Sequence, residues 1–161
     1  MVRYPDAVLS KKAKTVLRLS RKDRRLIQDM LDTMYAEGGV GLAAPQVGVS
    51  KRIIVISPRL KRGEEQILIN PEILGASGGE EAVPEGCLSL PGLSCPVRRA
   101  KKVRVRAWDV NGNERIQEME RFSARVLQHE IDHLNGTLIV DRLDLDGRQA
   151  ALSAYRTVSD R

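Results

Sequence analysis

The stretch Gln128-His129-Glu130-Ile131-Asp132-His133 contains both histidines of the 161-residue chain. Ser123 can cap a helix and Gly136 can end one, and apolar residues recur at helical spacing between them, so the sequence predicts a helix here. Residues four apart lie on one face of a helix, so both imidazoles can reach one metal ion. Glu130 is turned away from that line, where it can touch a water bound to the ion.

This spacing is typical of zincin-type hydrolases, in which two histidines bind the metal and the glutamate is the general base. The alternative is an ordinary helix with one packed and one exposed histidine. Because a glutamate stands at the required place and no other histidine occurs in the chain, we favour the metal site.

A catalytic site of this kind usually needs a third protein ligand. Cys87 is one candidate, since it lies in the segment 84–92, which has prolines near both ends and can approach a helix as a loop or strand edge. Its alternative is a small buried hydrophobe, the usual fate of a free cysteine. Downstream carboxylates at Asp141, Asp144 and Asp146 also stay open as ligands on spacing alone.

The segment 39–48, Gly-Val-Gly-Leu-Ala-Ala-Pro-Gln-Val-Gly, is a second candidate for the site. It lacks the Gly-Lys-Ser/Thr ending of a phosphate loop. If Gln46 is buried, its amide must find a partner, and an amide that points into a metal site can donate to an oxyanion. The alternative is a tight connection between elements.

The remaining patterns predict an α+β domain that spans residues 1–161, with antiparallel or mixed sheets packed around a central metal-binding helix that carries His-Glu-x-x-His. A helix is expected from Asp23 to Ala36 with Ser20 or Asp23 as its cap, and a short one at 147–159. Four strands are expected, with a hairpin turn at Asn111-Gly112 between the last two: 52–57, 66–70 (closed by Pro71), 103–110 and 114–121.

Composition narrows the class of protein. Aromatic residues make up 3% of the chain, which gives no set of platforms for stacking bases, so we expect no specific nucleic-acid partner. The net charge is +6, but the basic runs at 21–25 and 98–102 are short, and we interpret them as solvated faces, with a weak ribosome contact left open. No signal peptide or membrane span is evident, and two cysteines suit a reducing compartment, so we expect a cytoplasmic protein.

Three segments taken together resemble the peptide deformylase family. The likeness runs from Tyr4-Pro5-Asp6 to Asp141-Arg142-Leu143 and is strongest in three motifs: Gly41-Leu42-Ala43-Ala44-Pro45-Gln46, Glu85-Gly86-Cys87-Leu88-Ser89 and Gln128-His129-Glu130-Ile131-Asp132-His133. A lone His-Glu-x-x-His occurs in many proteins, whereas the three motifs in this order are specific.

The resemblance implies removal of the N-formyl group from the initiator methionine of nascent polypeptides, with release of formate. It makes Cys87 the third ligand beside His129 and His133, and it implies Fe²⁺ as the ion, with Zn²⁺, Ni²⁺ or Co²⁺ as substitutes. A metal-bound water would then attack the formyl carbon with Glu130 as general base and later acid. The Gln46 amide and the backbone N–H of Leu88 would stabilise the oxyanion.

The resemblance also implies how the substrate binds. The methionine pocket would be bordered by Val40, Gly41, Leu88, Val126 and His129, although Val40 and Val126 can equally be core residues. The peptide backbone would add as a strand along Val40-Gly41 and Gly86. Glu85 and Arg99 would form a buried ion pair beneath the site.

Two other classes of protein fit parts of the sequence. In a structural zinc module, Cys95 would join Cys87, His129 and His133 to close all four positions, and the basic charge would suggest nucleic-acid binding. Such a site has no use for Glu130. A zinc protease would keep the same helix with a carboxylate as third ligand, but it leaves the Cys87 motif unexplained.

Overall fold

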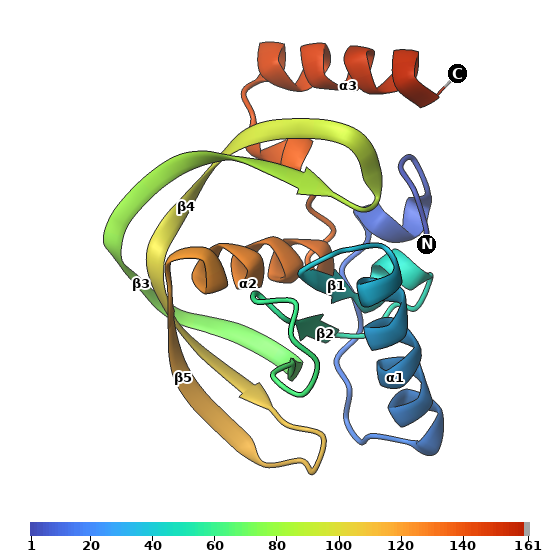
Figure 1. Cartoon of the computed structure of the whole chain (residues 1–161), viewed down its shortest axis with the longest axis vertical. Coiled ribbons are helices and arrows are strands. Elements are labelled where there is room, and N and C mark those ends of the chain that lie inside the picture. The colour runs from blue at the N-terminus through green and yellow to red at the C-terminus, as the bar shows by residue number, and fades with distance from the viewer. Residues whose placement is uncertain (160–161) are drawn as a thin grey trace.

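The computed structural model describes residues 1–159, and the side chains as far as Tyr155. Within that range, five strands form one antiparallel sheet in sequence order, and three α-helices pack around it (Figure 1). The strands are β1 (Gly41–Ala43), β2 (Ile53–Ile56), β3 (Gln66–Cys87), β4 (Leu90–Trp108) and β5 (Glu114–Glu120). The expected α+β class is confirmed.

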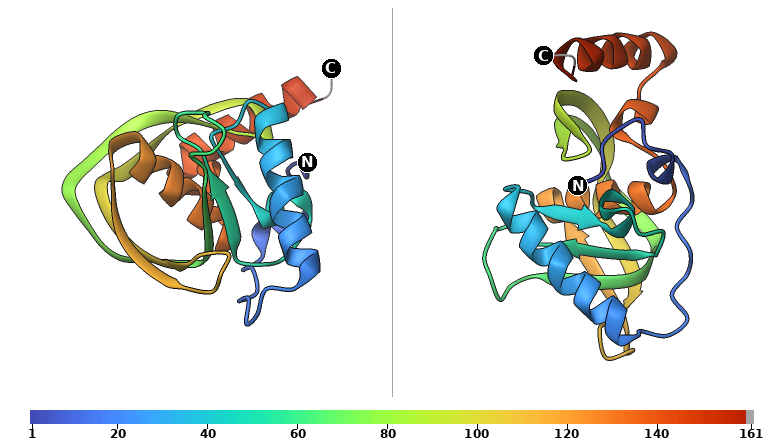
Figure 2. Two further views of the ribbon diagram at one scale, coloured as in Figure 1. Left: turned by 60° about the horizontal axis from the view of Figure 1, so that its bottom comes forward. Right: turned by 90° about the vertical axis from the view of Figure 1, so that its right-hand side faces the viewer.

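Helix α2 (Arg121–Leu134) lies on the concave side of the sheet, with β3, β4 and β5 curving around it (Figures 1 and 2). Its apolar side chains Ala124, Leu127 and Ile131 share one core cluster with residues of β2, β4 and β5. The alternation predicted for 103–110 is confirmed, since Val103, Val105 and Ala107 are buried. A helix enclosed in this way can hold buried polar side chains in fixed positions.

Helix α1 (Arg21–Ala36) covers the other face of β1 and β2. Ile53 and Val55 point toward α1, while Ile54 and Ile56 belong to the cluster around α2, which explains why all four residues of β2 are buried. The helix begins two residues before the predicted Asp23. Ser20 is its cap, in a capping box with Asp23 at the third helical position.

Strand β3 does not end at Pro71, so that prediction was wrong. Strand β2 pairs only with residues 66–69, and the register of β3 against β4 shifts between Ile69 and Glu72. Pro71 therefore sits at an irregularity on an edge where no ladder hydrogen bond is required. The pairing continues to Cys87, and β4 correspondingly begins at Leu90 instead of Val103.

The predicted cap of α2 was also wrong, because Ser123 lies inside the helix. Strand β5 runs directly into α2, and Glu120 is the N-cap without a side-chain hydrogen bond. The turn between them is made by Arg121, whose φ is +53°. At the other end Gly136 is confirmed as the stop, with φ +73° and the backbone of Ser10 packed against it.

Helix α3 (Leu145–Ser159) begins two residues before the predicted start and stands at one end of the molecule (Figure 1). It contacts β4 and the 3-10 helix η3 (Ile139–Arg142), and Tyr155 packs edge-on against Tyr4. None of the helices in residues 1–159 is both long and apolar enough to cross a membrane.

Candidate metal centre and active-site cavity

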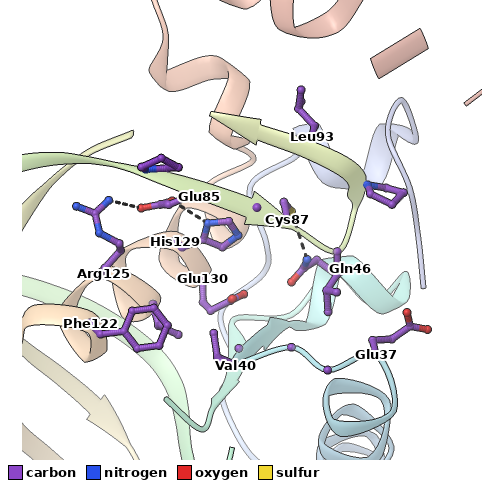
Figure 3. A pocket seen from close by; sticks show the side chains of 18 of the residues that line it. Glu37, Val40, Gln46, Glu85, Cys87, Leu93, Phe122, Arg125, His129 and Glu130 are labelled. Atoms are coloured by element: carbon purple, nitrogen blue, oxygen red, sulfur yellow. Dashed lines mark hydrogen bonds and ion pairs between the residues drawn. The ribbon is translucent and has the colours of Figure 1, made fainter. Parts of the chain in front are cut away.

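One thiol and two imidazoles converge inside the fold, and Figure 3 shows two of the three side chains, Cys87 and His129. The ligand atoms of Cys87, His129 and His133 all lie within 4.8 Å of one another. The Nε2 atoms of the two histidines are 3.3 Å apart, and Nε2 of His133 is 3.3 Å from Sγ of Cys87. Two nitrogen ligands bound at about 2.0–2.1 Å to one tetrahedral ion lie about 3.3–3.4 Å apart. The spacing therefore fits a single ion.

Local structure explains the convergence. His129 and His133 are one turn apart on α2, as the sequence predicted, and His133 is 1% exposed. Cys87 is the last residue of β3, where the register against β4 shifts between Gly86 and Cys87. The strand end thus delivers the thiol to the inner face of the helix.

Glu85 orients His129. The Nδ1 atom of His129 lies 3.0 Å from Oε2 of Glu85, so it donates there and leaves Nε2 to face Cys87 and His133. Arg99 and Arg125 both pair with the same carboxylate. Burial raises the pKa of Glu85, but the hydrogen bonds from His129 and Arg99 outweigh it and hold that pKa at about 2. The predicted Glu85–Arg99 ion pair is confirmed.

The two imidazoles of the cluster have opposite pKa shifts. Burial lowers the pKa of His129, yet its hydrogen bonds with Cys87 and Glu85 and the charge of Glu130 raise it to about 10. Burial and the neighbouring His129 push the pKa of His133 well below its ordinary value. His133 is therefore held neutral, which is the form in which an imidazole binds a metal ion.

Glu130 lies beside the ligand cluster and points toward β1 (Figure 3). Its side chain is buried, its Oε2 atom has no hydrogen-bond partner in the described chain, and burial raises its pKa to about 7. Gly41 is packed so closely against it that a Cβ there would lie 2.5 Å from Oε1. A buried carboxylate with an unused oxygen is suited to exchange a proton with a small molecule.

Gln46 lies in the 3-10 helix η2 (Ala44–Val47) directly after β1, and its amide is fixed at both ends. Oε1 accepts a hydrogen bond of 2.8 Å from the backbone N–H of Ala43. Nε2 donates toward Sγ of Cys87 at 3.8 Å and Oγ of Ser89 at 3.3 Å. The donor end therefore faces the cluster, as the sequence suggested for a buried glutamine.

A cavity of about 660 Å³ opens beside the cluster. Of the positions predicted for the site, His133 does not line this cavity. All the others do: Val40, Gly41, Gln46, Gly86, Cys87, Leu88, Val126, His129 and Glu130. Val126 lines this cavity, is 5% exposed and also belongs to the core cluster around α2.

Sequence reasoning missed several residues of the cavity wall, among them Phe122 and Arg125 from α2 and Leu93 from β4 (Figure 3). Arg125 is buried and donates to Glu85 and to the carbonyl oxygen of Val97. A signal was available for Arg125, because it precedes His129 by four residues and so shares its helix face.

The alternative ligands lie elsewhere. In the described part of the chain, the group of residues able to share an ion contains Cys87 and the two histidines but not Cys95. Asp141 accepts from the N–H of Leu138 and pairs with Arg148, while Asp144 accepts from the N–H of Gly147. Within residues 1–159, neither Cys95 as a fourth ligand nor a downstream carboxylate completes the cluster.

An α+β fold with a thiol, two imidazoles and a buried carboxylate at one end of a cavity has the residue set that metal-dependent hydrolases of the His-Glu-x-x-His type use. Residues 1–149 match the polypeptide deformylase family. A peptide deformylase of Thermodesulfovibrio yellowstonii is 46% identical over 157 residues, which cover 96% of this chain and 94% of that protein. Peptide deformylase 1 of Clostridium perfringens is 49% identical over 136 residues, 84% of this chain and 91% of its own length.

Comparison with solved structures leads to the same family. The crystal structure of a peptide deformylase from Legionella pneumophila superimposes with a TM-score of 0.91 at 43% identity, covering 99% of this chain and 96% of the other. A peptide deformylase from Ehrlichia chaffeensis gives a TM-score of 0.89 at 36% identity, with 99% and 95% covered. The chain belongs to the polypeptide deformylase family and is an enzyme of that class.

Proposed function

We propose that this protein removes the N-formyl group from the initiator methionine of nascent polypeptides and releases formate. The observation that carries the proposal is the placement of Glu130. Its carboxylate has an oxygen without a hydrogen-bond partner and lies beside the cluster of Cys87, His129 and His133. The same residue lines a cavity large enough for a side chain and a peptide end. Membership of the family supports the substrate class. Residues 1–161 would act as one catalytic domain.

Cys87, His129 and His133 would hold one divalent ion, which supplies Lewis acidity and makes hydroxide available near neutral pH. The donor set fits, since one thiol and two imidazoles suit Fe²⁺ and also Zn²⁺, Ni²⁺ or Co²⁺. By family resemblance we propose Fe²⁺. The converging Nε2 atoms and the hydrogen bond from His129 to Glu85 favour the ligand roles over a packed pair of histidines.

Glu130 would accept the proton of the attacking water and later deliver it to the leaving amine. Its oxygen without a partner is the acceptor, and a pKa raised to about 7 by burial lets the same group act as base and then as acid. General acid–base help of this kind contributes roughly 10²–10⁴-fold in rate.

Gln46 and Leu88 would stabilise the negative charge that develops on the formyl oxygen. The Nε2 atom of Gln46 already faces Cys87, and its orientation is fixed by the bond from Ala43 to Oε1. Leu88 follows the thiol in the chain, so its backbone N–H would be the second donor. Each preorganised donor of this kind contributes roughly 10²–10³-fold to the rate.

The methionine side chain would enter the cavity between Val40, Leu88 and Val126, beside Gly41 and His129. Its peptide backbone would lie along Val40-Gly41 and Gly86 as an added strand. Main-chain hydrogen bonds of this kind ignore the sequence that follows methionine. The enzyme could therefore process many nascent chains while it requires formyl-methionine at the front.

The test is formate release from a formyl-Met tripeptide by protein loaded anaerobically with Fe²⁺, beside Glu130→Gln with its metal content measured. Rapid release that falls by at least about 10²-fold in the metal-replete variant is expected. Glu64→Gln, which alters a surface ion pair with Arg59 and Lys61, is the matched control and should keep full activity. No release from fully metallated wild-type protein would overturn the proposal.

A further inference from the structure

Arg142 lies outside the cavity, at the end of η3, yet it is connected to a buried carboxylate on α2. Its Nε donates to Oδ2 of Asp132 at 2.9 Å, and its Nη2 makes a short contact with Oδ1 of the same residue. Asp132 is 5% exposed, whereas the Arg142 side chain is 47% exposed. The guanidinium therefore clamps both oxygens of a buried aspartate from the protein surface.

Asp132 also forms an ion pair with Arg99. Nη1 of Arg99 lies 2.5 Å from Oδ2 of Asp132, while Nε and Nη2 hold the two oxygens of Glu85 at 3.1 and 3.0 Å. Glu85 in turn accepts from Nδ1 of His129 at 3.0 Å. Four consecutive contacts thus lead from Arg142 to a proposed metal ligand, and every link after Arg142 is largely buried.

We propose that Arg142 is a positioning residue for His129 and acts through Asp132, Arg99 and Glu85. The inference rests on the proposed metal site. Its physical basis is competition for Arg99, which is shared between two carboxylates. With Arg142 in place, the charge of Asp132 is divided between two guanidinium groups. Without it, Asp132 draws Arg99 toward itself and loosens the hold of Arg99 on Glu85.

The effect should be partial, because Glu85 has a second cationic partner. Nη1 of Arg125 donates to its Oε1 at 2.7 Å, and Arg125 also binds the carbonyl oxygens of Val97 and Glu81. Glu85 would stay charged and in place on average. Without Arg142, the carboxylate of Glu85 is held less firmly in its orientation toward His129. That orientation fixes the imidazole ring in the position that metal binding requires.

The same segment provides a matched control. Arg148, in α3, pairs with Asp141 at 3.1 Å and is 44% exposed, close to the exposure of Arg142. This pair ties α3 to η3 but touches no member of the chain of contacts that ends at His129. Arg148→Ala therefore removes an arginine of similar exposure together with its ion pair, and leaves the contacts that end at His129 untouched.

The experiment uses Co²⁺-loaded protein and compares Arg142→Ala, Arg142→Lys and Arg148→Ala. Arg142→Ala should speed the dissociation of Co²⁺ by up to about 10-fold, the lower end of what loss of a direct outer partner of a ligand costs in affinity, and should alter the visible absorption of the bound ion. It should lower kcat for formyl-Met peptides while KM stays within about twofold. Lysine keeps the charge but cannot clamp both oxygens, so it should recover part of the loss. Arg148→Ala should match wild type.

A double-mutant cycle tests the route. If Arg142 acts through Glu85, then Arg142→Ala should change Co²⁺ dissociation much less in a Glu85→Gln background than in the wild type. Should Glu85→Gln fail to fold, Arg99→Lys takes its place in the cycle. Additive effects, or an Arg142→Ala protein that loses thermal stability with unchanged Co²⁺ dissociation and spectrum, would overturn the proposal. These cobalt measurements need no substrate, so they stand apart from any failure of the deformylase assignment.

Discussion

Gly41 and Glu130 lie so close together that a Cβ atom on residue 41 would stand 2.5 Å from Oε1 of the glutamate and 2.9 Å from its Cδ. Gly41 is a buried residue of β1, and β1 is held by β2 through the pairing of Gly41 with Ile56. Strand β1 cannot move away from Glu130 without breaking its pairing with β2. The glycine therefore sets where the carboxylate of Glu130 can lie.

The first prediction concerns this contact. Gly41→Ala should lower kcat for formyl-Met peptides by about 10²-fold or more, because the methyl group displaces the proposed general base. Metal content should stay at wild-type level, since none of the three ligands is touched. Gly75→Ala is the control, because a Cβ at that position meets nothing within 4 Å. An active Gly41→Ala enzyme would show that the position of Glu130 does not matter.

The second prediction concerns Gln46. Gln46→Glu keeps an oxygen to accept from the backbone N–H of Ala43 but loses the N–H₂ group that faces Cys87. Removal of one oxyanion donor should reduce kcat by roughly 10²–10³-fold with metal retained. Metal analysis and steady-state kinetics on the same sample separate this effect from loss of the ion. A variant with wild-type kcat would remove Gln46 from the proposed oxyanion site.

The third prediction separates a catalytic site from a closed structural one. Cys87→Ser should weaken metal binding strongly, while Cys95→Ser should bind one ion per chain as the wild type does. Cys95 is 2% exposed in an apolar cluster, and burial raises the pKa of its thiol, which disfavours the thiolate that a metal needs. Loss of metal and of folding in Cys95→Ser would revive the four-ligand module.

Local pattern was enough to predict part of this site. The positions of His129, Glu130 and His133 follow from helical spacing, and the helix forms where its apolar residues predicted it. Alternating burial in Val103, Val105 and Ala107 follows from the two-residue period of a strand in the same way. Each of these inferences needs only residues within one turn or one strand of each other.

Other parts depend on contacts between distant segments. Cys87 reaches the histidines because β3 continues past Pro71, and that continuation depends on β2 pairing no further than residue 69. The contact of Arg142 with Asp132 depends on how the fold places η3 against β3 and β4. No local sequence period indicates such contacts, so the prediction that Cys87 is a metal ligand rests on the resemblance to the family and not on spacing.

The last prediction concerns stability and pH. Asp23 is 3% exposed, and its carboxylate accepts hydrogen bonds from Lys51 and from the backbone and hydroxyl of Ser20. Burial raises the pKa of Asp23, but the bonds from Lys51 and Ser20 outweigh it and hold that pKa below 3.8. A carboxyl with a lowered pKa in the folded state contributes stability above its unfolded pKa and loses it as the pH falls through the folded value.

Asp23→Asn should therefore reduce the free energy of unfolding by about 1 kcal/mol at pH 7, because the amide can still accept from Ser20 but loses the negative charge that pairs with Lys51 and favours the start of α1. The difference from wild type should begin to shrink as the pH falls below about 4, where the unfolded chain takes up the proton, and should vanish as the pH falls through the lower pKa of the folded carboxyl. Urea unfolding at a series of pH values measures this. Asp29→Asn is the control, because Asp29 forms an exposed ion pair with Arg25. It should lower the free energy of unfolding by less than about 0.5 kcal/mol. A constant gap between Asp23→Asn and wild type down to pH 3 would mean that the charge of Asp23 does not stabilise the start of α1.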